Sequence, residues 1–246
     1  MHARQLHAVL KQITTRDRFS TILVQPRIAV AQSGAAARLH GLVLVEFIRG
    51  ALVALLRDGV TPSRALWREA ELLEVIQSAQ EFCYLWNGDT LETEAGAAPP
   101  PLDAFSGPLL LAMTMLKERS FVIEWVHDQQ GRLFVLDLKL LPRDVFGDAG
   151  ELTRAVMTSC FHTLARRFPG TEEPLIAAAR FQHAICRDRP LYAEYHSLAR
   201  TSRPFVYRTG GVLSHPVVYA MRSNIPVILC PEAYAQISGE CAVSAP

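Results

Sequence analysis

The sequence has few cysteines, almost no net charge and no long hydrophobic run. Its five cysteines are odd in number and widely spaced, and no CxxC pair occurs, so neither a disulfide framework nor a structural zinc site is indicated. This pattern favours a reducing, cytoplasmic compartment. A net charge of +1, from 25 basic and 24 acidic residues, provides no broad field for holding nucleic acid. The longest apolar run, Pro108 to Leu116, is well short of the roughly 20 residues that span a bilayer, so we expect no membrane partner.

What the sequence does contain is enough apolar material for a folded core, because half of the 246 residues are hydrophobic and a fifth are charged. Apolar periodicity predicts a mixed α/β protein. The predicted helices cover 1–13, 67–84, 107–119 and most of 151–167 and 173–200. The predicted strands cover 19–24, 41–48 and 51–56, with a helix as the alternative for the apolar stretch 41–56. A surface loop over 92–101 and a β-hairpin over 120–138 are also predicted.

The C-terminal segment predicts a β-turn-α-β unit that closes an α/β domain. A strand over 205–207, a turn over 208–211, a helix over 214–221 and a strand over 225–229 follow one another closely. The turn-rich residues 143–150 are the candidate linker between this part and the first one.

One histidine lies where the helix of this unit begins. Gly210 and Gly211 permit conformations closed to other residues, Ser214 is a favourable N-cap, and His215 follows it. At the positive end of a helix, a neutral imidazole can attack phosphorus and the phosphoryl group is then stabilised. The alternative is a capped helix with a solvent-facing histidine that has no chemical task.

The hairpin brings two acidic residues together. If His127 and Arg132 flank a four-residue loop, Glu124 faces Val135 and Asp137 is its diagonal neighbour on the same face. Such a pair can hold Mg²⁺, which prefers oxygen ligands and accompanies nucleotide phosphates. The alternative is a solvated strand face with two ordinary acids.

Residues 205–246 resemble the second half of the swivelling phosphohistidine domain of phosphoenolpyruvate-utilising enzymes, the family of phosphoenolpyruvate synthase, pyruvate phosphate dikinase and rifampicin phosphotransferase. The motif of that family consists of two glycines, a Ser or Cys and the phosphorylated histidine. This chain matches it with Gly210, Gly211, Ser214 and His215. The resemblance implies that His215 carries a phosphoryl group and that the other three support the phosphate.

Residues 19–141 resemble the latter half of the ATP-grasp nucleotide-binding domain of the same enzymes. Ile123-Glu124-Trp125 matches the first strand of its terminal hairpin, and Asp137-Leu138-Lys139 stands where the family has Gln-x-Arg. The resemblance implies that Glu124 and Asp137 are metal ligands and that Lys139 contacts the nucleotide.

Three upstream segments also resemble this domain. They are Val24-Gln25, the turn at Ser33-Gly34 and the acidic strand beginning at Glu46. The resemblance implies nucleotide contacts for Gln25 and Glu46.

The implied architecture is a partial ATP-grasp-like domain (1–142), a linker (143–150) and a small swivelling β/β/α phosphohistidine-type domain (151–246). The implied function is an ATP-dependent phosphotransferase that uses ATP and Mg²⁺ and rotates about the linker to reach an unidentified phosphoryl acceptor. Because the first half of the ATP-grasp domain has no counterpart, we expect a second protein chain to supply it. The alternative is a non-catalytic binding or regulatory subunit derived from that family.

Overall fold

The computed structural model describes residues 28–39, 42–68, 71–88, 90–96, 98, 101–102, 106–114, 121–140, 184–194, 200, 203–222, 225, 227–229, 231, 234–235 and 237–238. Predictions for other residues, including the helix over 1–13, the strand over 19–24 and the linker, lie outside this part. The described residues form a mixed α/β fold rich in strands, so the coarse fold prediction is confirmed. None of their helices combines the length and apolarity that a membrane crossing requires.

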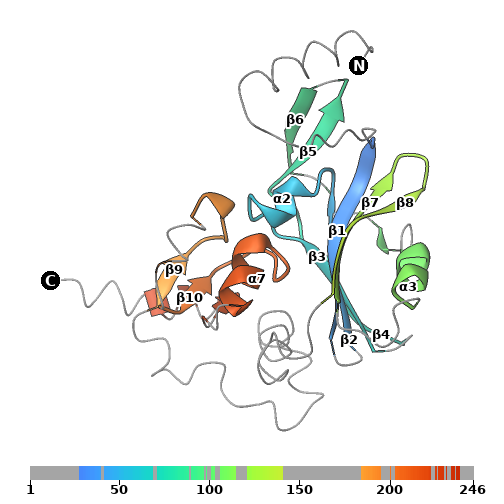
Figure 1. The fold of residues 1–246 in the computed structure, drawn as a ribbon. Coiled ribbons are helices and arrows are strands. Elements are labelled where there is room, and N and C mark those ends of the chain that lie inside the picture. Colours follow the sequence, from blue (N-terminus) through green and yellow to red (C-terminus); the bar gives the residue numbers. More distant parts are fainter. Residues whose placement is uncertain are drawn as a thin grey trace, which may run out of the picture.

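A six-stranded antiparallel sheet forms the centre of the fold (Figure 1). Strands β1 and β7 are neighbours in this sheet although they are distant in the sequence, so the β7–β8 hairpin is joined to the N-terminal strands through β1. The order across the sheet is β4 (Glu71–Ile76), β3 (Ser63–Arg68), β2 (Leu42–Arg49), β1 (Val30–Leu39), β7 (Phe121–Asp128) and β8 (Leu133–Leu140).

The two faces of this sheet pack against different partners. Ala36 of β1 belongs to a core with helix α3 (Ser106–Thr114), whereas Ala35 and Ala37 belong to a core on the opposite face. This alternation follows from the period of two along a strand. Figure 1 shows α3 on one side of the sheet and the C-terminal elements on the other.

The C-terminal elements form a small parallel sheet with one covering helix. Strand β10 (Phe205–Tyr207) pairs in parallel with β9 (Ile185–Arg187) and with β11 (Val227–Leu229). Helix α7 (His215–Arg222) lies between β10 and β11 in the chain, and a short 3-10 helix, η3 (Tyr192–Glu194), follows β9. The predicted β-turn-α-β unit is therefore confirmed.

One apolar core joins the two parts of the chain. Leu44, Leu55 and Leu66 from before residue 143 share a cluster with Phe205 and Val217 from after residue 150. All five side chains are almost fully buried. Separation of the parts would expose this cluster to water, so the docked arrangement is stabilised by apolar burial.

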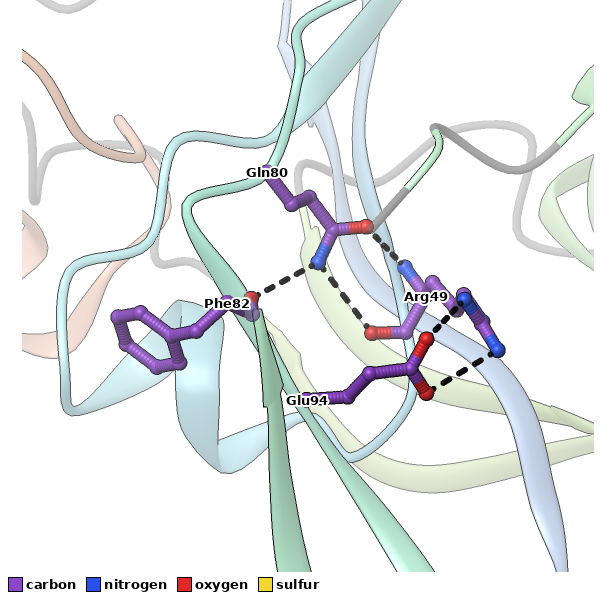
Figure 2. A network of polar contacts seen from close by, with 4 residues as sticks. All are labelled: Arg49, Gln80, Phe82 and Glu94. Atoms are coloured by element: carbon purple, nitrogen blue, oxygen red, sulfur yellow. Dashed lines mark hydrogen bonds and ion pairs between the residues drawn. The ribbon is translucent and has the colours of Figure 1, made fainter. Parts of the chain in front are cut away.

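A two-stranded hairpin, β5 (Phe82–Asn87) and β6 (Thr90–Ala95), is attached to the end of β2 by the polar contacts drawn in Figure 2. The Gln80 amide accepts a hydrogen bond from the Arg49 N–H and donates to the Arg49 and Phe82 carbonyls. The Arg49 guanidinium pairs with Glu94 of β6 at 3.0 Å. These contacts fix the base of the hairpin.

The helix predicted over 67–84 is wrong. Its residues end β3, form all of β4 and begin β5. Leu72 and Val75 of β4 are exposed, so this edge strand lacks the alternation that marks a half-buried strand. Pairing with β3 supplies the long-range hydrogen bonds that overrule the helical spacing of its apolar residues.

Four shorter assignments also change. Residues 51–56 contain α2 (Val53–Leu56), which is the helical alternative rather than a strand. Ser33-Gly34 lies within β1 and is not a turn, and residues 92–95 belong to β6 rather than to a loop. Ile185–Arg187 is a strand instead of a helix, because it pairs with β10.

Candidate functional site

His215 is the first residue of α7, as the sequence predicts. The Val218 N–H donates to the Ser214 carbonyl at 3.0 Å, which places Ser214 at the N-cap position. The Ser214 hydroxyl is buried and forms no hydrogen bond within the described part of the chain. The side chain of His215 is 42% exposed, so its ring is open to a ligand.

The two glycines before the helix are required by close packing. Gly210 has a φ of +122°, and a Cβ there would collide with the ring of Pro190. At Gly211, a Cβ would lie 2.7 Å from Leu55 and 2.9 Å from the Glu46 carboxylate. The diglycine therefore lets the loop lie directly on the sheet.

The acidic pair of the hairpin is confirmed, but its register differs from the prediction. A bulge next to Glu124 places Asp137 directly opposite it, whereas Trp125 faces Val135. The Asp128 N–H donates to the Arg132 carbonyl, so the loop has three residues and not four. The two carboxylates are consequently direct neighbours across the strands, which a diagonal pair would not be.

Lys139 lies against both carboxylates. Its ammonium is 2.9 Å from Glu124 Oε1 and 2.9 Å from Asp137 Oδ2. Glu124 has a side-chain exposure of 16%, whereas Asp137 and Lys139 are about half exposed, so only Glu124 is largely enclosed by protein.

The structure brings the predicted histidine to the predicted acidic pair. His215 Nε2 lies 3.5 Å from Glu124 Oε1, although the two residues are separated by 91 positions in the sequence. The ring of Tyr192, from η3, meets the His215 ring edge to face with centroids 6.1 Å apart. His215, Glu124, Asp137 and Lys139 thus form one cluster, which we call the His–carboxylate cluster.

The electrostatics of this cluster follow from these contacts. The hydrogen bond with His215 lowers the pKa of Glu124, burial opposes this effect, and the Lys139 ammonium adds to it, so the net direction is downward. Burial acts to lower the pKa of Lys139, but Asp137 and Glu124 outweigh burial and raise it. With a neutral imidazole, two carboxylates and one ammonium leave one net negative charge, which repels an anionic phosphate.

The donor set fits Mg²⁺. The Lys139 ammonium already lies between the two carboxylates. Within the described ranges, no group of three or more His, Cys, Asp or Glu could enclose a metal ion. Two carboxylates are the usual protein share of a Mg²⁺ site that is completed by substrate phosphates and water.

Glu46 has different contacts from those expected of a nucleotide ligand. Its side chain is fully buried, and its two oxygens accept hydrogen bonds from Arg64 Nε and from the N–H groups of Val212 and Leu213, each at 2.8 Å. A nucleotide could reach this carboxylate only by displacing those donors. Gln25 lies outside the described residues.

Arg64 and Tyr192 are two residues near the cluster that sequence reasoning missed. Arg64 faces Glu46 across β2 and β3 and also donates to the Gly210 carbonyl. The only sequence signal was that Glu46 and Arg64 interrupt apolar strands, because a buried charge requires a partner of opposite sign. No signal pointed to Tyr192.

Comparison of the chain with protein-family models finds no match, and comparison with curated proteins finds none either. The functional interpretation therefore depends on the residues and their geometry.

Proposed function

We propose that this protein is an ATP-dependent phosphotransferase in which His215 carries the phosphoryl group. The observation that carries the proposal is the 3.5 Å approach of His215 Nε2 to Glu124 Oε1, in a cluster with Asp137 and Lys139. A nucleophilic imidazole, two potential metal ligands and a phosphate-binding ammonium then lie within one site.

His215 is the nucleophile in this proposal. The Nε2 lone pair forms the N–P bond, the P–O bond to the departing phosphate breaks, and its electron pair leaves with that oxygen. Nε2 must be unprotonated for this step, so the reactive tautomer carries its proton on Nδ1, and the 42% exposure of the side chain permits proton exchange with water. The amide groups at the start of α7 favour the anionic product.

The other residues prepare the phosphates for attack. Lys139 would contact a phosphate oxygen on leaving one of its two carboxylates, and Glu124 and Asp137 would hold Mg²⁺. Bound Mg²⁺ supplies the positive charge that the net negative cluster lacks. His215 already lies at the carboxylates, so loading needs no rotation about residues 143–150. The proposal also includes a second chain that completes the ATP site, and delivery to the acceptor by such rotation, for which the two parts would have to separate at the apolar core they share.

The proposal is tested by phosphoryl labelling. The protein is incubated with Mg²⁺ and ATP labelled at the β- or γ-phosphate, and acid-labile, alkali-stable label is measured. With the fraction that supplies the second chain added, we expect label on the unsubstituted chain, none on His215→Ala, and at least about tenfold slower labelling for Glu124→Gln. His127→Gln is the matched control, because His127 lies on β7, the strand of Glu124, but is not a member of the cluster. Equal loss in both histidine variants would contradict the assignment.

One observation favours a second candidate, a non-catalytic binding or regulatory subunit. Lys139 already pairs with both carboxylates, so the cluster holds a cation without a metal. This candidate predicts no label with any partner fraction added and no heat of Mg²⁺ binding in calorimetry, whereas the phosphotransferase predicts both signals.

A further inference from the structure

The loop before His215 is fixed by a buried ion pair. Glu46 lies in β2 and Arg64 faces it in β3, with Arg64 Nε 2.8 Å from Glu46 Oε1. The side chain of Glu46 has no exposed surface and that of Arg64 is 10% exposed. A carboxylate that is removed from water to this extent needs donors on both of its oxygens.

Most of those donors belong to the loop. The Val212 N–H donates to Glu46 Oε1 and the Leu213 N–H donates to Oε2, both at 2.8 Å. Arg64 donates its Nη2 proton to the Gly210 carbonyl. The ion pair thus binds three backbone groups within four consecutive residues, with acceptors for two N–H groups and a donor for one carbonyl.

The second glycine of the loop is explained by this contact. A Cβ at Gly211 would lie 2.9 Å from Glu46 Oε2 and 2.7 Å from Leu55, which is closer than real Cβ atoms approach other groups. Gly211 is therefore needed to admit the carboxylate, independently of any phosphate.

We infer that Glu46 and Arg64 are a positioning pair that holds the Gly210–Leu213 loop on the sheet and thereby sets His215 against Glu124. His215 is two residues beyond Leu213, so its distance to Glu124 depends on where the loop backbone lies. Departure of the loop removes two of the three donors that contact Glu46 and leaves its buried charge poorly solvated. The docked position of His215 is consequently favoured over partly docked ones. The inference rests on the proposed function only for its effect on labelling.

The first test uses the unsubstituted protein and needs no activity. We expect the amide protons of Val212 and Leu213 to exchange with solvent roughly 100-fold slower than in an unstructured peptide. Rapid exchange of both amides in the folded protein would overturn the inference.

The second test uses Glu46→Gln and ¹⁵N-histidine NMR. We expect the Val212 and Leu213 amides to lose protection, the Val218 amide to keep it, and the His215 ring resonances to move toward those of Glu124→Gln. Glu94→Gln is the matched control, because it likewise removes a carboxylate from an arginine, here Arg49 of β2, in the exposed ion pair drawn in Figure 2. Unchanged His215 resonances in a folded Glu46→Gln protein, or equal movement in Glu94→Gln, would overturn the inference.

If Glu46→Gln does not fold, Gly211→Ala tests whether Glu46 and Arg64 position His215. It displaces the carboxylate with a methyl group and changes no charge, and we expect the same movement of the His215 resonances. Labelling by ATP separates the two proposals. A chain that takes no label but shows these NMR changes refutes the phosphotransferase and supports the positioning pair. A chain that is labelled equally fast with and without Glu46→Gln refutes the positioning pair alone.

Discussion

The hydroxyl of Tyr207 is a buried polar group whose removal we expect to stabilise the protein. Tyr207 is fully buried, burial raises its pKa, and its oxygen forms no hydrogen bond within the described residues. Because an unsatisfied buried donor costs about 1–3 kcal/mol, Tyr207→Phe should raise the free energy of unfolding by about 1 kcal/mol in urea denaturation. Tyr84→Phe is the control and should not gain stability, because burial and the nearby Asp58 carboxylate raise the pKa of the Tyr84 hydroxyl, which is therefore not isolated from polar groups. Equal losses for both would show that Tyr207 has a partner.

Lys139 is a second residue with a distinctive expectation, because it lies between the two carboxylates that are the metal ligands in the proposed function. Lys139→Met leaves Glu124 and Asp137 facing each other without a cation, so we expect Mg²⁺ alone to bind about tenfold more tightly in calorimetry. Arg132→Met is the matched control on the same hairpin, where the guanidinium pairs with Asp128. Unchanged or weaker Mg²⁺ binding by Lys139→Met would exclude the carboxylate pair as the metal site.

At the scale of elements, the β7–β8 hairpin shows what an apolar pattern can and cannot predict. Its strands and its glycine turn were predicted, and Gly131 has a φ of +79° as such a turn requires. The pairing was not predicted, because a bulge and a three-residue loop add a residue without changing which residues are apolar. That shift places Asp137 opposite Glu124 and makes the acidic pair closer than expected.

Asp128 makes the turn of this hairpin sensitive to acid. Burial acts to raise its pKa, but hydrogen bonds from the backbone and side chain of Arg132 and from the Gln130 N–H outweigh burial and lower it below 3.8. A carboxyl group whose pKa is lower in the folded protein than in the unfolded chain stabilises the fold. This stabilisation is fully present when the pH is above the pKa of the unfolded chain, and it is lost as the pH falls through the pKa of the folded protein.

We therefore expect Asp128→Asn to be less stable than the unsubstituted chain at pH 7, with the difference shrinking below about pH 4. Urea midpoints measured from pH 7 to pH 3 provide the comparison. Asp188→Asn is the control, because Asp188 pairs with Arg208 at an exposed position. A constant difference across the whole range would show that Asp128 does not titrate with folding.

At the scale of the whole molecule, the sequence predicted which residues form the His–carboxylate cluster better than it predicted how they are held. His215, Glu124, Asp137 and Lys139 were identified from short motifs, since each motif fixes local chemistry. Glu46 and Arg64 hold the loop through hydrogen bonds between positions that are 146 to 167 residues apart in the sequence. No local pattern predicts such bonds.

The shared core gives the last prediction, which concerns the cooperativity of unfolding. Phe205 is fully buried in the core that joins the two parts, and Phe205→Ala should cost about 3–5 kcal/mol. The three tryptophans of the chain, Trp67, Trp86 and Trp125, all precede the predicted linker, so their fluorescence reports only on the first part.

If the core couples the two parts, the urea midpoint seen by tryptophan fluorescence must fall in Phe205→Ala, although the substitution lies in the other part. Leu138→Ala is the control, because Leu138 is 43% exposed and its loss should change stability by no more than about 0.5 kcal/mol. A fluorescence midpoint that stays the same in Phe205→Ala would mean that the two parts unfold independently. The docked position of His215 would then not be stabilised by apolar burial.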